Sequence, residues 1–260
     1  MYPAVYAASA PDRPAIIQAS TGRVTTYKEL HEAALRLANV LRSAGVKPGD
    51  HVALCMENHE RYLEVIWGCH YAGTVYTACS SRLTKAELAY ILNDCKAMAF
   101  ITSKYKSDQA LEIAGEIPGV SLRLMLDGTV DGYDSFEKTV DAAPATDLPD
   151  MVDGIDMLYS SGTTGMPKGV AKPFPGTPLG SAAGLGAPLT QGLYKFREGM
   201  VYLPPRRCTT PPHCGSTCRS TPTAAPPWSW STSTRRTTCA TPRSTAPRTP
   251  SWFPRCSSAC

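Results

Sequence analysis

The chain has 260 residues, 43% of them hydrophobic and 18% charged, and a formal net charge of +4. These averages hide a break near residue 204. The tail, residues 205–260, holds eight arginines but no Lys, Asp or Glu, so it carries +8 while residues 1–204 carry −4. The tail also lacks Leu, Ile, Val, Met and Tyr. It therefore cannot bury enough apolar surface to offset its ordering entropy, and we predict no fold for it.

The start of the chain, MYPAVYAASAPDRPA, lacks the basic segment and apolar run of a secretory signal. No run approaches the ~18 apolar residues that a membrane-spanning helix requires. Four cysteines are scattered through residues 1–204 without paired spacing: Cys55, Cys69, Cys79 and Cys95. This pattern favours reduced thiols over a disulfide framework. We therefore expect a cytoplasmic protein with no membrane span.

Helical and strand patterns alternate through the first 140 residues. Helices are predicted over 26–45, 58–73, 84–92 and about 107–116, and strands over 51–56, 97–102 and 121–127. Capping-box patterns mark two helix starts, Thr26 with Glu29 and Thr84 with Glu87, and Asn58 is the predicted cap of a third helix. This alternation predicts an α/β fold of layered βαβ units, with a mainly parallel sheet covered by helices.

Several charged and polar side chains of this part have ordinary structural interpretations. The pattern of Glu57, Glu60 and Glu64 around Arg61 is typical of a solvated helix face. The histidines at 31, 51, 59 and 70 have no obvious convergent partner and are interpreted as surface or hydrogen-bonded residues. None of these residues is a candidate for catalysis.

A polar linker over 141–150 leads to a strand predicted at 155–160, which runs into the stretch YSSGTTGMPKGV (159–170). Phosphate chains need backbone N–H donors, hydroxyls and a point cation, and α/β proteins place them beyond the carboxyl end of a strand. Glycines let the backbone approach such a ligand closely. The candidate phosphate-binding residues are Ser160, Ser161, Gly162, Thr163, Thr164, Gly165, Lys168 and Gly169.

The spacing differs from a Walker loop, in which a lysine directly follows the second glycine and precedes Ser or Thr. Here Gly162 and Gly165 are three residues apart, and Lys168 is followed by Gly169. A flexible connector is the alternative interpretation. A connector, however, has no need of a lysine and four hydroxyls in a fixed order.

The stretch 159–170 closely resembles the phosphate-loop signature of the AMP-forming acyl-CoA synthetases and other adenylate-forming enzymes. It departs from the usual form only at Ser160, where Thr is commoner and where Ser keeps the hydroxyl. The segments PDRPA (11–15), TYKELHEAALRLANVL (26–41) and SRLTKAELAYILND (81–94) are also similar to that family. The resemblance covers residues 1–204 and implies the amino-terminal part of the large adenylate-forming domain.

The resemblance implies a two-step ligase. A carboxylic acid, with a fatty acid as the first choice, attacks the α-phosphate of ATP and releases pyrophosphate. The thiol of CoA then displaces AMP and forms a thioester. Mg²⁺ accompanies the nucleotide, but the family's metal-binding glutamate motif is not found, so the metal ligands are unknown. The residues that would hold the β- and γ-phosphates are Ser161, Gly162, Thr163, Thr164, Gly165 and Lys168, with Lys168 and Thr164 as the catalytic candidates.

The tail departs from the family, whose ribose-binding and carboxy-terminal segments are missing from it. If the last base of each tail codon is joined to the first two bases of the next, the possible codons can encode LYHAAPL near 208–214 and VPTMFVRM near 252–260. Both sequences are similar to family segments. We therefore interpret the tail as out-of-frame translation after a break near 203–207. Three hypotheses follow. The first is an acyl-CoA ligase with little or no activity in this chain, or another adenylate-forming ligase that acts on aryl or amino acids. The second is a non-catalytic remnant, and the third is a tail that serves as a nucleic-acid-binding arm, for which no specific binding is expected.

Overall fold

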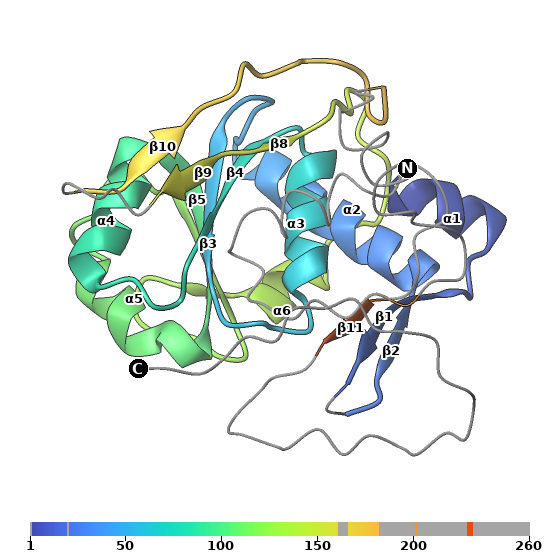
Figure 1. Ribbon diagram of the computed structural model, residues 1–260, viewed down its shortest axis with the longest axis horizontal. Coiled ribbons are helices and arrows are strands. Elements are labelled where there is room, and N and C mark those ends of the chain that lie inside the picture. The colour runs from blue at the N-terminus through green and yellow to red at the C-terminus, as the bar shows by residue number, and fades with distance from the viewer. Residues whose placement is uncertain (1, 20, 161–165, 182–200, 202–227, 231–260) are drawn as a thin grey trace, which may run out of the picture.

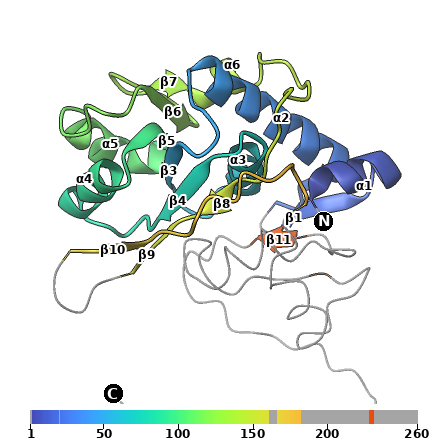
Figure 2. The same ribbon diagram turned by 90° about the horizontal axis from the view of Figure 1, so that it is seen from above.

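The structure of the chain, a computed structural model, describes residues 2–19, 21–160, 166–181, 201 and 228–230. Its body has three layers, with a parallel β-sheet between two groups of helices (Figures 1 and 2). Helices α1, α2, α3 and α6 share a core with one face of the sheet, and α4 and α5 share a second core with the other face. The predicted α/β fold is confirmed.

The helices are α1 (Pro3–Ser9), α2 (Tyr27–Ser43), α3 (Tyr62–Tyr71), α4 (Lys85–Asp94), α5 (Ser107–Ile113) and α6 (Phe136–Val140), with a short 3-10 helix η1 (Lys104–Lys106) before α5. The strands are β1 (Pro14–Gln18), β2 (Val24–Thr26), β3 (His51–Cys55), β4 (Val75–Cys79), β5 (Ala97–Ser103), β6 (Leu122–Leu126), β7 (Asp134–Ser135), β8 (Ile155–Asp156), β9 (Leu158–Ser160), β10 (Lys168–Val170) and β11 (Trp228–Trp230). Among the described residues, no helix has both the length and the apolar character needed to cross a membrane.

The main sheet has six strands in the order β7-β6-β5-β3-β4-β8, and all its pairs are parallel. Successive side chains of a strand point to opposite faces. Val52 and Leu54 of β3 accordingly enter the core with α2 and α3, while Ala53 and Cys55 enter the core with α4 and α5. Burial on both faces explains why these strands appear in the sequence as continuous apolar runs.

The helix starts follow the local sequence signals in two of three cases. The capping boxes of Thr26 with Glu29 and Thr84 with Glu87 are both present, at the starts of α2 and α4. The prediction that Asn58 caps the next helix is wrong. Helix α3 begins at Tyr62 after Arg61, with no side-chain cap.

Replacing Thr84 with Ala should lower the free energy of unfolding by about 1 kcal/mol, because the start of α4 loses its side-chain cap. The Oγ1 of Thr84 accepts a hydrogen bond from the backbone N–H of Glu87 at 3.3 Å. Urea denaturation measures the change, and Thr84→Ser, which keeps the hydroxyl, is the matched control. Equal stability of the Ala and Ser variants would contradict the assigned cap.

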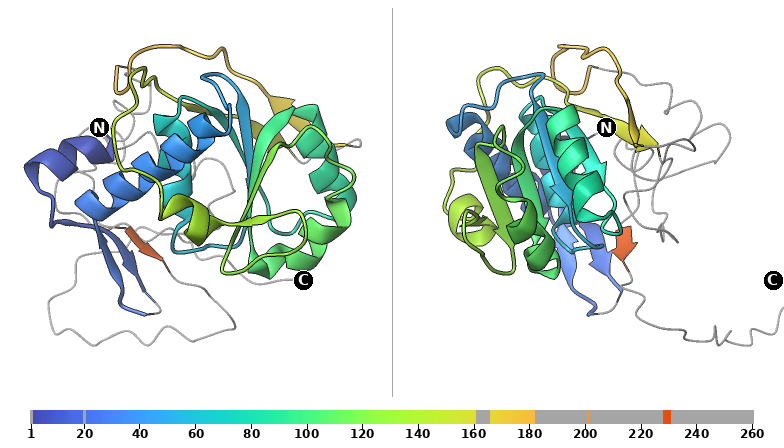
Figure 3. Two further views of the ribbon diagram at one scale, coloured as in Figure 1. Left: turned by 180° about the vertical axis from the view of Figure 1, so that it is seen from behind. Right: turned by 90° about the vertical axis from the view of Figure 1, so that its left-hand side faces the viewer.

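A second, three-stranded sheet stands beside the main body, as both views of Figure 3 show. Its strands β1 and β2 form an antiparallel hairpin, and β11 pairs with β1 in parallel. Strand β11 consists of three residues of the tail that pair with β1. The prediction of a tail without fold did not include this strand. The other tail residues lie outside the described part, so the prediction for the tail as a whole is untested.

Candidate functional site

The glycine-rich stretch lies on a hairpin that grows out of the main sheet. Strand β8 pairs with β4, and the backbone N–H of Met157 continues the ladder by donating to Tyr76 O at 2.9 Å. Strand β9 follows at once and pairs with β10 in antiparallel fashion. The predicted strand over 155–160 is thus present, in two parts. Figure 2 shows the hairpin running on from β8 toward α4.

Ser160 and Lys168 are directly opposite each other at the ends of β9 and β10. The residues between them, 161–167, are called the glycine loop below. Both are exposed, and the Ser160 Oγ donates to the Lys168 carbonyl oxygen at 3.4 Å. One hydroxyl and one ammonium therefore lie at the two ends of the loop. The remaining predicted residues, 161–165, lie outside the described residues.

Gly169 has a packing role that the sequence analysis did not include. A Cβ at this position would lie 2.4 Å from the Met157 Cε and 2.9 Å from the Tyr159 Cζ. A larger residue would therefore require these side chains to shift, because Met157, between β8 and β9, and Tyr159 of β9 fill the space in front of Gly169. The assigned role of Gly169 in phosphate binding stays a prediction.

Two polar contacts attach the hairpin stem, strands β9 and β10, and the segment that follows it to the body. The Tyr159 hydroxyl donates to Asp94 Oδ2, at the end of α4, at 2.5 Å. The Lys172 ammonium donates to Asp156 Oδ2 at 2.8 Å, and the Asp156 side chain is 5% exposed. Burial, followed by the hydrogen bond to Asp94, raises the pKa of Tyr159 well above its usual value, so the phenol stays protonated and able to donate.

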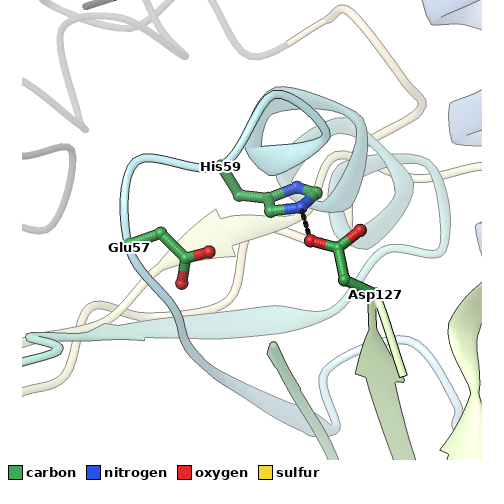
Figure 4. Close-up of side chains that lie close together, drawn as sticks. All are labelled: Glu57, His59 and Asp127. Atoms are coloured by element: carbon green, nitrogen blue, oxygen red, sulfur yellow. Dashed lines mark hydrogen bonds and ion pairs between the residues drawn. The ribbon is translucent and has the colours of Figure 1, made fainter. Parts of the chain in front are cut away.

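Within the described residues, one group of three side chains brings potential metal ligands within 4.8 Å of one another: Glu57, His59 and Asp127. Figure 4 shows the His59 Nε2 directed at Asp127. Nε2 lies 2.9 Å from Asp127 Oδ2, Nδ1 accepts from the backbone N–H of Arg61, and the Ser103 hydroxyl donates to Glu57. Because Nδ1 is an acceptor, the proton of the neutral ring is on Nε2. Neither ring nitrogen then offers a lone pair to a metal.

The same hydrogen bonds test whether this group could hold the Mg²⁺ expected with ATP. Mg²⁺ prefers several water molecules together with one or two carboxylates at octahedral positions. Here one carboxylate accepts from a buried serine and the other from a buried histidine. The group does not fit the ion, and we derive no reaction step through it.

A pocket of about 460 Å³ lies between the β1–β2 hairpin and the helices α2, α3 and α6. Its charged lining is largely paired internally. Arg23 forms an ion pair with Glu60, and Arg61 forms ion pairs with Glu64 and Asp141. These pairs give the pocket a structural explanation and leave the β9–β10 hairpin as the candidate functional site.

The chain is similar in sequence to known proteins over most of its described part. The AMP-binding enzyme family matches residues 4–177, which include the whole hairpin. A feruloyl-CoA synthase of Amycolatopsis sp. is 40% identical over 149 residues, which are 57% of this chain and 28% of that protein. A long-chain-fatty-acid–CoA ligase of Thermus thermophilus is 34% identical over 154 residues, which are 58% of this chain and 28% of that protein.

The fold also matches solved structures. The inhibitor-bound N-terminal domain of FACL13 from Mycobacterium tuberculosis superposes with a TM-score of 0.74, over 87% of this chain and 55% of that one, at 22% identity. The chain thus spans less than a third of the length of the curated relatives named above. Because the family match extends over most of the chain and includes the hairpin, the chain belongs to the AMP-binding enzyme family.

Proposed function

We propose that this protein derives from a ligase that activates a carboxylic acid with ATP and transfers the acyl group to CoA, and that the β9–β10 hairpin binds the pyrophosphate end of ATP. The observation that carries the proposal is the pairing of exposed Ser160 with exposed Lys168 at the two ends of the glycine loop. The family match over residues 4–177 supports it.

In the first step of the proposed reaction, a carboxylate oxygen attacks the α-phosphorus, and the bond to the β-phosphate breaks. Pyrophosphate leaves with increased negative charge. The Lys168 ammonium stabilises that charge, together with the loop residues Ser161, Gly162, Thr163, Thr164 and Gly165, and the Ser160 hydroxyl adds a donor when it turns from the Lys168 carbonyl oxygen to the phosphate. Such transfer depends mainly on positioning and charge stabilisation. Mg²⁺, when bound to the nucleotide, supplies further charge neutralisation.

In the second step, the CoA thiolate attacks the carbonyl carbon of the acyl-adenylate, and AMP leaves. A fatty acid is our first choice of substrate, because one relative is named a long-chain-fatty-acid–CoA ligase. Other relatives are named feruloyl-CoA synthase and 2-succinylbenzoate–CoA ligase, which favours an aryl acid as the alternative. A cytoplasmic location fits this chemistry and the four buried free thiols of the described part.

A non-catalytic remnant is the second candidate. It is favoured by the composition of the tail, residues 205–260, which we interpret as out-of-frame translation. On this interpretation residues 1–204 are a partial adenylate-forming domain. They keep the phosphate-binding hairpin and support little or no turnover.

Incubation with ATP, Mg²⁺ and CoA separates the two candidates. Palmitate, ferulate and 2-succinylbenzoate are supplied in turn, and AMP is measured, with Lys168→Ala as the control. Acid-dependent AMP formation that Lys168→Ala abolishes would establish a ligase, and the acid that supports it would identify the substrate class. AMP formation at background level with every acid is the result expected of the remnant.

A further inference from the structure

A hydrogen bond between distant parts of the chain attaches the hairpin stem to helix α4. The Tyr159 hydroxyl donates to Asp94 Oδ2 at 2.5 Å, and the two residues are 65 positions apart. Tyr159 directly precedes Ser160, and its cross-strand partner Gly169 directly follows Lys168. The contact therefore lies one residue, about 3.3 Å of strand, from both ends of the glycine loop.

Asp94 is poorly suited to its position in α4 unless it has such a partner. It is the last residue of the helix, where the carbonyl ends carry partial negative charge. An acidic side chain in the last turn is repelled by that charge. The hydrogen bond from Tyr159 offsets this repulsion, so helix stability alone does not explain the aspartate.

The ring of Tyr159 transmits the contact across the hairpin. A Cβ on Gly169 would lie 2.9 Å from the Tyr159 Cζ and 3.1 Å from its hydroxyl oxygen. The ring therefore lies against the backbone of β10 while its hydroxyl is held by α4. The ring thus packs against the backbone next to Lys168.

We propose that Asp94 and Tyr159 are positioning residues, which hold the hairpin so that Ser160 and Lys168 converge on the phosphate chain of the nucleotide. This inference rests on the proposed function, because the ligand of the hairpin is the pyrophosphate end of ATP. It adds a residue of α4, far from the glycine loop in sequence, to the set that determines phosphate affinity. Neither side chain touches the ligand.

Two measurements on the full chain test this proposal. Hydrogen–deuterium exchange of the backbone amides in peptides covering β9 and β10 reports the order of the stem without any ligand. Calorimetric titration with inorganic pyrophosphate reports the function of the site. The variants are Tyr159→Phe, which keeps the ring, Asp94→Ala, and Asp94→Asn, which keeps an acceptor oxygen. Tyr105→Phe, at a tyrosine that is 69% exposed, is the matched control.

We expect Tyr159→Phe and Asp94→Ala each to speed exchange in the stem and to weaken pyrophosphate binding by about 3- to 10-fold, as loss of one hydrogen bond would. The double variant should be no weaker than either single variant, because both remove the same contact. Asp94→Asn should recover most of the affinity, and Tyr105→Phe should match the wild type.

The outcomes separate failure of this inference from failure of the proposed function. Unchanged stem exchange in Tyr159→Phe and Asp94→Ala would overturn the positioning role, whatever the affinity. Loss of affinity in Lys168→Ala but not in Tyr159→Phe would overturn it as well, while leaving the proposed function intact. Equal pyrophosphate binding by the wild type and Lys168→Ala would overturn the proposed function and, with it, the positioning role.

Discussion

The Arg61→Ala variant should lose about 3–5 kcal/mol of its free energy of unfolding, the cost of leaving a buried charge without its partner. The guanidinium of Arg61 holds Glu64 through two hydrogen bonds of 2.7 and 2.8 Å. Glu64 is only 7% exposed. The same guanidinium also bonds Asp141 and lies 4.8 Å from the centre of the Phe136 ring, so it joins α3 to α6.

This loss should depend on pH. Burial raises the pKa of Glu64 above its usual value of 4.5, and Arg61 opposes that rise. A raised pKa means that the folded state binds the proton more tightly than the unfolded state, so stability from this group is lost as pH rises through the folded pKa. Without Arg61 the pKa rises further. The loss of unfolding free energy in Arg61→Ala, relative to the wild type, should therefore be largest near neutral pH and should shrink as the pH falls toward 4.5.

Urea denaturation at pH 7.5 and pH 5 measures both effects. The double variant Arg61→Leu/Glu64→Leu is the control, because it removes both charges and should recover most of the stability. A deficit in Arg61→Ala that stays constant over this pH range would contradict the assigned role of the buried carboxylate.

Replacing Gly154 with Ala should lower the free energy of unfolding by about 2–3 kcal/mol. This is at the upper end of the cost of overpacking, because the added Cβ would clash with backbone atoms, which cannot rotate away. A Cβ at this position would lie 2.8 Å from both the His70 Cα and the Thr74 carbonyl oxygen, and 2.9 Å from the Cys69 carbonyl oxygen. These backbone atoms form the junction of α3 and β4. Strand β8 would be pushed away from β4, and the hairpin that follows it would move as well.

Thermal and urea denaturation of Gly154→Ala measure this cost. Gly115→Ala is the matched control, because a Cβ there meets nothing within 4 Å. Gly115→Ala should leave the free energy of unfolding unchanged or raise it by up to about 1 kcal/mol, because alanine restricts the unfolded chain more than glycine does. Equal stabilities of the two variants would mean that Gly154 is not a close-approach position.

Local patterns were sufficient to predict the elements that carry their own signals. Both capping boxes formed as predicted, because each needs only residues three positions apart. Strand β4 was not predicted, since Tyr76 and Thr77 interrupt its apolar pattern, although both are buried where β4 lies between β3 and β8. Its strand character depends on pairing with β3 and β8, which the local sequence does not contain.

Long-range contacts account for the features near Arg61 and at the hairpin that the sequence alone did not predict. The solvated face predicted around Arg61 was wrong, because Asp141, 80 positions further on, closes over Arg61 and Glu64 is buried. The Tyr159–Asp94 contact was likewise not predicted, since its residues belong to different predicted elements. The glycine loop was recognised from its residue order alone, but the pairing of Ser160 with Lys168 became visible only through the hairpin register.

The central claim is that this hairpin binds the pyrophosphate end of ATP through Lys168. Titration of the full chain with inorganic pyrophosphate tests it most directly, for the wild type, for Lys168→Ala and for Lys138→Ala, an exposed lysine of α6 as the control. We predict that Lys168→Ala weakens binding about 10- to 100-fold, as expected for loss of a charged hydrogen-bond donor, and that Lys138→Ala matches the wild type. Equal affinities of all three proteins, or no binding by any of them, would contradict the claim.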